Sequence, residues 1–263
     1  MAEGSVTALV LAFGLMMMPQ MAIAQSTAIA ALPTFSAQAA QGRFEELRNS
    51  LSATLRVIIL LSMPAALGLI LLRQPLVTFL YQRGEFSEHS TSLVAWALAW
   101  YAAGLVGHSI LEVVSRAFYA LHDTRTPVTV GVVAMCLNIV FSFAFVELFD
   151  RAGWMPHGGL ALANSLATAL EVVTLVFLIR KRMGSLKGQR LTAAFWQSGL
   201  GILGMAITLS ISNRFLSGNS AAMTALGGAL IGAAIYFLIL LGLKAPEAKQ
   251  LIEVVKRRFV RSG

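Results

Sequence analysis

Three polar side chains lie in or beside long apolar stretches of the sequence, where their chemistry would be binding rather than catalysis. Arg56 stands at the start of one stretch, and Asn138 and Glu171 stand near the middle of two others. An ionisable group at mid-membrane costs at least about 2.5 kcal/mol on insertion scales, so it usually faces a cavity or a partner. We therefore expect Glu171 either to line a polar path, with Asn138 as a further candidate, or to be protonated and bonded to a neighbouring helix. Arg56 is expected either to face a polar cavity and hold a phosphate, or to extend its charge to the membrane surface.

Catalytic and metal chemistry are not indicated by the remaining reactive residues. His89, His108, His122 and His157 occur at unrelated spacings, and the sequence contains no Ser/His/Asp arrangement, phosphate loop or HExxH motif. The single cysteine, Cys136, lies in an apolar run, which excludes a disulfide framework or a cysteine-rich metal site within one chain. The sequence predicts no enzyme activity, no cofactor and no metal.

Two glycine patterns are better explained by helix packing than by a ligand. Gly199, Gly201 and Gly204 match the dinucleotide-binding pattern, but they lie in an apolar span with no strand before them, and the pattern needs that context. Gly228 and Gly232 form a GxxxG pair, which lets another helix approach closely. We expect that approach to occur within the chain, and dimerisation is the alternative.

The elements that carry these residues are predicted to be membrane-spanning helices. The sequence is 57% hydrophobic and 12% charged, whereas a soluble domain usually carries about twice that charge. Its apolar residues occur in blocks long enough to cross a bilayer core of roughly 30 Å. The fold class is therefore all-α, a polytopic transmembrane bundle of about seven spans. The predicted spans cover residues 6–31, 54–72, 93–114, 127–148, 158–179, 191–211 and 221–243.

The basic residues divide unequally between the two sides of this seven-span topology. The net charge is +8, and because the basic residues lie in short loops beside apolar blocks, a membrane is favoured over nucleic acid as the partner. Four basic residues fall on one side: Arg73, Arg83, Arg151 and Arg214. Sixteen fall on the other: Arg43, Arg48, Arg56, Arg116, Arg125, Arg180, Lys181, Arg182, Lys187, Arg190, Lys244, Lys249, Lys256, Arg257, Arg258 and Arg261. The positive-inside rule places the second side, with the C-terminus, in the cytoplasm and the N-terminus outside.

The two ends of the chain differ in kind. The first residues lack the basic region of a signal peptide, and an exterior N-terminus leads us to expect further sequence upstream. We divide the chain into a transmembrane domain, residues 1–243, and a cytoplasmic tail, residues 244–263. Apolar and basic residues of the tail fall on different helical arcs, so it is predicted to be a basic amphipathic helix at an anionic leaflet or a solvated tail.

Several segments resemble the MurJ/MviN lipid II flippase family, within the superfamily of multidrug, oligosaccharidyl-lipid and polysaccharide exporters. The strongest is residues 116–128, RAFYALHDTRTPV, which contains Arg116, Asp123, Arg125 and Pro127 and is similar to the family segment RAFYAxxDTRTPV. Residues 18–36 resemble a second family segment, and the likeness extends from about residue 4 to residue 182. Glu112 and Arg116 also form an i, i+4 pair, which we expect to be a structural ion pair.

The resemblance implies a fold of about fourteen spans in two halves, of which this chain would be the second, with an N-terminal half as its partner. It implies transport of a polyprenyl-pyrophosphate-linked cell-wall precursor, lipid II, across the bacterial inner membrane. A cavity between the halves would carry basic residues for the headgroup, and a groove between the last two spans would take the lipid tail. Membrane lipids are the other expected partners.

The sequence departs from the family where a charged pair usually precedes the first span's proline. Phe13 and Gly14 occupy those positions, so an arginine that would contact pyrophosphate is absent, and Met18 and Gln20 also depart from the pattern. The predicted function is that of the C-terminal half of a lipid II flippase acting by alternating access. The alternatives are a truncated or degenerate membrane module that does not transport, and an exporter of another polyprenyl-linked glycan.

Overall fold

The computed structural model describes residues 3–84, 86–184, 188–216 and 220–243. The predicted cytoplasmic tail, residues 244–263, lies outside the described residues. Within them the chain forms ten α-helices and one π-helix, η1, and no strand, so the predicted all-α class is confirmed. The helices are α1 (Ser5–Gln20), η1 (Met21–Gln25), α2 (Ser26–Ala40), α3 (Phe44–Leu71), α4 (Arg73–Tyr81), α5 (Glu88–Ala103), α6 (Leu105–Ala120), α7 (Arg125–Arg151), α8 (His157–Met183), α9 (Gly188–Leu216) and α10 (Ala221–Gly242).

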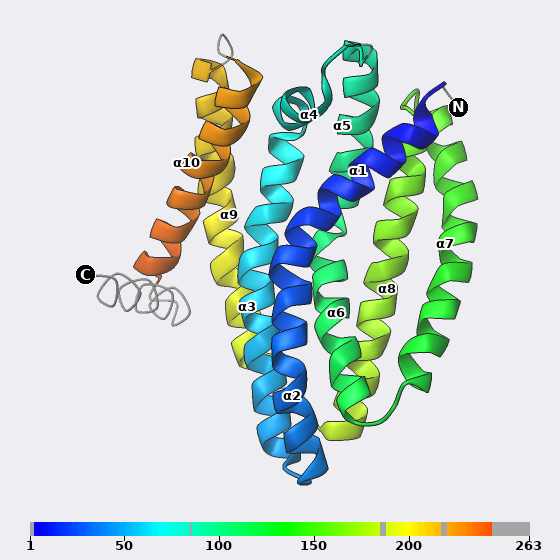
Figure 1. Cartoon of the computed structure of the whole chain (residues 1–263), viewed down its shortest axis with the longest axis vertical. Coiled ribbons are helices and arrows are strands. Elements are labelled where there is room, and N and C mark those ends of the chain that lie inside the picture. The colour runs from blue at the N-terminus through cyan, green and yellow to red at the C-terminus, as the bar shows by residue number, and fades with distance from the viewer. Residues whose placement is uncertain (1–2, 85, 185–187, 217–219, 244–263) are drawn as a thin grey trace.

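The helices form one bundle. Figure 1 shows α9 and α10 at one edge and α7 at the other, with α3, α6 and α8 between them and α1 crossing in front. α7 packs mainly on α8, while α9 packs on α3 and α10. The described loops lie at the two ends of the bundle, as expected for a polytopic membrane protein (Figure 1).

Six helical segments of the described chain are long and apolar enough to cross a membrane, or seven if one bent pair counts as a single span. The bent pair is α5 and α6, which meet at 46° across Gly104. This bend divides the helix predicted over residues 93–114. α8 approaches there so closely that a Cβ on residue 104 would collide with the Ser165 side chain, so the bend depends on a contact that is distant in the sequence.

The first span is longer than predicted, because α1, η1 and α2 run as one segment of 36 residues, Ser5–Ala40. Pro19 lies in the last turn of α1, directly before the π-helix. Helix-breaking residues are tolerated in membranes when side chains and local π geometry satisfy the backbone. Here the hydroxyls of Ser26 and Thr27 donate to the carbonyls of Ala22 and Ile23, at 2.6 Å each.

α4 was not among the predicted spans, because its nine residues are too few to cross a bilayer. It begins at Arg73, immediately after α3, and packs on α5 and α10. The Arg73 guanidinium donates to the carbonyl of Ile70 at 2.8 Å and so caps the C-terminal end of α3. α4 therefore covers the end of the bundle where the N-terminus lies (Figure 1).

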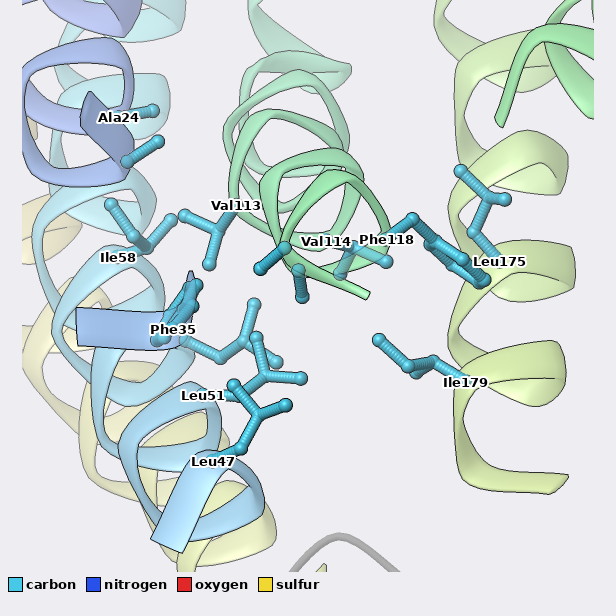
Figure 2. Close-up of a cluster of buried hydrophobic side chains, with 14 residues drawn as sticks. Ala24, Phe35, Leu47, Leu51, Ile58, Val113, Val114, Phe118, Leu175 and Ile179 are labelled. Carbon is cyan, nitrogen blue, oxygen red and sulfur yellow. The ribbon is translucent and has the colours of Figure 1, made fainter. Parts of the chain in front are cut away.

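The interior near the opposite end is filled by large aliphatic and aromatic side chains. Figure 2 shows Phe35 from α2, Ile58 from α3, Phe118 from α6 and Leu175 from α8 in one cluster. Phe35, Ile58 and Leu175 are at most 1% exposed. Lipid tails are as apolar as these side chains, so close van der Waals packing rather than transfer from water holds such a cluster together.

Candidate functional site

A cavity of about 730 Å³ opens beside α10 and is walled mainly by α3, α4 and α1. The residues that line it are Leu15, Met18, Pro19, Val57, Leu60, Leu61, Pro64, Ala65, Gly68, Leu69, Leu72, Leu76, Leu80, Met205, Ala229, Ala233, Tyr236, Phe237 and Leu240. Of these, Tyr236 is the one whose side chain carries a hydroxyl or any other nitrogen or oxygen atom. A cavity of this size and lining suits a flexible hydrocarbon and not a charged group.

Small and cyclic residues create the space. Gly68 on α3 and Ala229 and Ala233 on α10 present little side-chain volume, and Pro64 interrupts the hydrogen bonding of α3 beside them. The resemblance implied a groove between the sixth and seventh spans, which correspond to α9 and α10. The cavity described above lies between α10 and α3, with Met205 contributed by α9, and the groove between α9 and α10 stays a prediction.

Arg56 of α3 lies where α3 packs against α9. Its side chain is buried, with the residue 9% exposed, and its Nη2 donates to Gln197 Oε1 at 2.9 Å. It is absent from the cavity lining, although Val57 follows it there. The guanidinium is thus engaged by a neutral amide on another helix.

Asn138 and Glu171 are both half-buried, and they lie on α7 and α8, which pack against each other. A Cβ built on Gly131 of α7 would lie 3.2 Å from Glu171 Oε1, so the carboxyl group points toward α7. Asn138 Oδ1 is shielded from solvent and has no hydrogen-bond partner in the described part of the chain. Arg56 lies at a different contact between helices, so the structure does not gather the three predicted path residues at one site.

Phe13 and Gly14, the positions that depart from the family pattern, have different surroundings. The Phe13 ring packs edge-on against Tyr101, with centroids 5.3 Å apart, and lies 6.3 Å from the His108 ring. Gly14 is exposed, and a Cβ there would meet no atom within 4 Å. Gly14 precedes Met18 by four residues and shares its helix face, so it lies one turn from the rim of the apolar cavity.

Residues 116–128, the segment with the strongest family resemblance, connect α6 to α7 and contact α8. Asp123 accepts hydrogen bonds from the Thr126 backbone amide at 3.0 Å and from its hydroxyl at 2.8 Å, and it pairs with Arg182 of α8 at 2.6 Å. These bonds, first that from the Thr126 amide, hold the pKa of the Asp123 carboxyl below its usual value. Arg125 and Pro127 lie in the first turn of α7, where a missing N–H costs nothing.

Arg116 forms the predicted ion pair with Glu112 at 3.3 Å within α6, which confirms the structural interpretation. Glycines of both patterns also pack within the chain. Gly201 faces the Tyr236 ring of α10, and Gly228 and Gly232 face Leu72 and Met205. The GxxxG pair is therefore used for packing inside the bundle, as expected.

The structure contains two polar clusters that the sequence does not indicate. His108 Nε2 of α6 lies 3.1 Å from Asn164 Oδ1 and 3.4 Å from Thr168 Oγ1, both on α8. Tyr236 of α10 bonds across to α3 and α9. No spacing within one segment signals either cluster, because the partners lie on separate helices.

Comparison with known proteins identifies the family. A family model described as lipid II flippase MurJ matches residues 1–237. The chain belongs to this family. Its long apolar helices make it an integral membrane protein.

Individual relatives agree with this assignment. The chain is 27% identical over 237 residues to a probable lipid II flippase MurJ of Vibrio cholerae, an alignment that covers 84% of this chain and 43% of the relative. It is 31% identical over 180 residues to the lipid II flippase MurJ of Burkholderia cenocepacia, covering 68% and 34%. The chain thus spans less than half the length of these curated relatives.

The fold has a counterpart among solved structures. A lipid II flippase MurJ in an inward closed conformation superposes with a TM-score of 0.75 at 23% identity. The match covers 95% of this chain and 49% of that structure. The chain therefore has the fold of about half of a MurJ structure.

Proposed function

We propose that this chain is the C-terminal half of a lipid II flippase, which moves a polyprenyl-pyrophosphate-linked glycan across the bacterial inner membrane. The single observation that carries the proposal is the apolar cavity of about 730 Å³ in a chain of this family. A polyprenyl chain is a long hydrocarbon that such a cavity can shelter while the headgroup stays in a polar space outside it. Rocking of two halves around the headgroup would provide alternating access.

The proposal includes a partner and an orientation. The partner is an N-terminal half, which would supply the second wall of the headgroup cavity. The orientation follows from the sixteen-to-four division of basic residues, with the C-terminus cytoplasmic and the N-terminus exterior. Cysteine labelling at Ser87 and Ser262, in a Cys136→Ser background, should modify the two positions from opposite sides. Labelling from the same side would reject this topology.

Complementation tests the function. Cells depleted of their lipid II flippase should be rescued by this chain together with the N-terminal half of a relative, and not by this chain alone. Failure of the pair would reject transport of lipid II by this chain. Rescue by the chain alone would instead reject the requirement for a partner.

A second function, a membrane module that does not transport, is favoured by one observation. The segment Ser5–Ala40 contains no Asp, Glu, Lys, Arg or His, although it forms one rim of the cavity through Met18 and Pro19. Burying a pyrophosphate without a cation is costly, and charge-assisted bonds from arginine normally offset that cost. Arg56 of α3 is the other candidate for a cation that would pair with the pyrophosphate, but its guanidinium donates to Gln197.

Gly14→Arg separates the two functions, because residue 14 has open space around it and lies one turn from the cavity rim. If the chain is a module that has lost transport, the pair should fail to rescue and Gly14→Arg should restore both lipid II binding and rescue. Gly14→Ala is the matched control and should change neither. If the unaltered pair already rescues and Gly14→Arg adds no binding, the non-transporting function is excluded.

A further inference from the structure

Pro64 leaves a backbone carbonyl of α3 without its helical donor. Proline has no N–H, so the carbonyl four residues earlier, that of Leu60, cannot form its usual bond within the helix. Both residues line the apolar cavity, whose side chains offer almost no polar group to pair with it. A carbonyl left unpaired in such surroundings is costly, and in membrane helices a neighbouring helix commonly supplies the missing donor.

Tyr236 of α10 supplies that donor. Its hydroxyl donates to the Leu60 carbonyl at 2.7 Å, and its oxygen lies 3.1 Å from Ser198 Oγ of α9. Because a phenol has one proton, the Ser198 hydroxyl can donate in return to the Tyr236 oxygen. The residue is 4% exposed, so this three-helix contact is shielded.

The α9 backbone provides the space for the ring. A Cβ on Gly201 would lie 2.6 Å from the Tyr236 ring, closer than real contacts allow. Gly201 belongs to the glycine pattern for which the sequence predicts no cofactor. Its position instead lets the ring lie close against α9 with its hydroxyl at the Leu60 carbonyl.

The geometry points to Tyr236 as the positioning residue that fixes α10 against the proline-interrupted part of α3 and so sets the width of the apolar cavity. The inference rests on the proposed function, because the cavity must take a polyprenyl chain for its width to matter. Leu60, Pro64 and Tyr236 all lie in the cavity wall, so the bond joins two of the helices that enclose the space a chain would occupy. Without the hydroxyl, the Leu60 carbonyl is unpaired and α10 loses its fixed distance from α3.

Binding of polyprenyl phosphates by the full chain tests the inference. Tyr236→Phe should weaken binding of undecaprenyl phosphate by about threefold to tenfold, the range expected for one interhelical hydrogen bond in a membrane protein. Farnesyl phosphate is too short to fill the cavity, so its binding should change less and the ratio of the two affinities should fall. Tyr119→Phe, a tyrosine outside the cavity, is the matched control and should change neither affinity.

The Pro64→Ala background makes the test specific. An alanine at this position has an N–H that can bond to the Leu60 carbonyl within α3, so the Tyr236 hydroxyl is no longer required there. In that background Tyr236→Phe should change undecaprenyl phosphate affinity by less than about twofold, as a double-mutant cycle would report for two coupled groups. An equal loss in both backgrounds would overturn the inference.

A measurement without ligand separates this inference from the proposed function. Spin labels at Ala53 on α3 and Leu238 on α10, both exposed, report the distance between the helices by pulsed electron resonance in a Cys136→Ser background. Tyr236→Phe should broaden that distance distribution, and adding Pro64→Ala should narrow it again. An unchanged distribution overturns the positioning role. Failure of the unaltered chain to bind undecaprenyl phosphate, with the distances responding as stated, would overturn the proposed function alone.

Discussion

The α3–α10 contact and the α7–α8 seam both bury polar groups among apolar side chains, but they satisfy them differently. At the first, the Leu60 carbonyl and the Tyr236 hydroxyl pair with each other at 2.7 Å. In the second, Asn138 Oδ1 is shielded and has no hydrogen-bond partner in the described part of the chain, and Glu171 points toward Gly131. A satisfied polar contact fixes a geometry, whereas an unsatisfied one in a membrane marks a candidate functional group. The α3–α10 contact therefore fixes the distance between two helices, whereas the α7–α8 seam is the candidate location of a polar path.

The largest effect is expected where α7 and α8 touch backbone to backbone. A Cβ on Gly159 would lie 2.6 Å from the Phe145 carbonyl group, which cannot move aside as a side chain can. Gly159→Ala should lower the free energy of unfolding by about 2 kcal/mol through overpacking. Thermal unfolding in detergent measures it, and Gly199→Ala, where a Cβ meets nothing within 4 Å, is the control. Equal midpoints for the two variants would show that this seam is loosely packed.

Asp123→Ala should remove the ion pair that ties the α6–α7 loop to Arg182 at one end of the α7–α8 contact. Loss of the bonds to Thr126 and Arg182 should cost about 1 kcal/mol at neutral pH, as for a lost helix N-terminal acceptor. Because the pKa of Asp123 is lowered in the folded protein, its stabilisation is complete above its unfolded pKa of about 3.9 and is lost as pH falls through the folded pKa. The difference between the variant and the unaltered chain should therefore shrink below about pH 4. A difference that is constant with pH would exclude the ionised carboxylate as its source.

Gly201→Ala should displace the Tyr236 ring and reproduce much of the effect of Tyr236→Phe. The new methyl group overlaps a side chain rather than the backbone, so the loss should be smaller than for Gly159→Ala, about 1 kcal/mol. The measurement is the unfolding midpoint of the single and double variants. Additive losses for Gly201→Ala and Tyr236→Phe would show that the ring and hydroxyl act independently, so that the α3–α10 contact would not be a single coupled unit.

Asn138→Leu should have the smallest effect on stability and the opposite sign. Removing an amide oxygen that lacks a partner should be neutral or raise the free energy of unfolding by about 0.5 kcal/mol. If Asn138 lies on the transport path, the same variant should lose rescue of flippase-depleted cells when paired with an N-terminal half. A clear loss of stability would mean that the amide is already satisfied, and would remove this seam as the place of a polar path.

The sequence predicts those features that depend on local pattern. Long apolar runs locate the helices, and the i, i+4 spacing of Glu112 and Arg116 predicts their ion pair. Features that need contacts between distant segments are not predictable in this way. The bend at Gly104 requires Ser165, and the bond between Asp123 and Arg182 joins residues far apart in the sequence.

The same limit applies to the site. Pro64 can be read from the sequence, and so can the lack of a helical donor for the Leu60 carbonyl. The donor that replaces it, the Tyr236 hydroxyl of α10, comes from a distant segment and is not predictable in this way. The resemblance implies a groove for a lipid tail between α9 and α10, and the cavity between α10 and α3 is a further candidate that the sequence does not indicate. For Arg56 the sequence predicts either a phosphate ligand or a charge extended to the membrane surface, and the structure adds a bond to Gln197 that no sequence spacing indicates.

Photo-crosslinking tests most directly the central claim that the cavity beside α10 holds the polyprenyl tail. Benzoylphenylalanine is placed at Ala233, which lines the cavity, or at Val133, which is 54% exposed on α7. The two chains are irradiated in membranes that contain isotopically labelled lipid II. We expect labelled lipid on the Ala233 variant and little on the Val133 variant. Equal labelling at both positions, or none at Ala233, would contradict the claim.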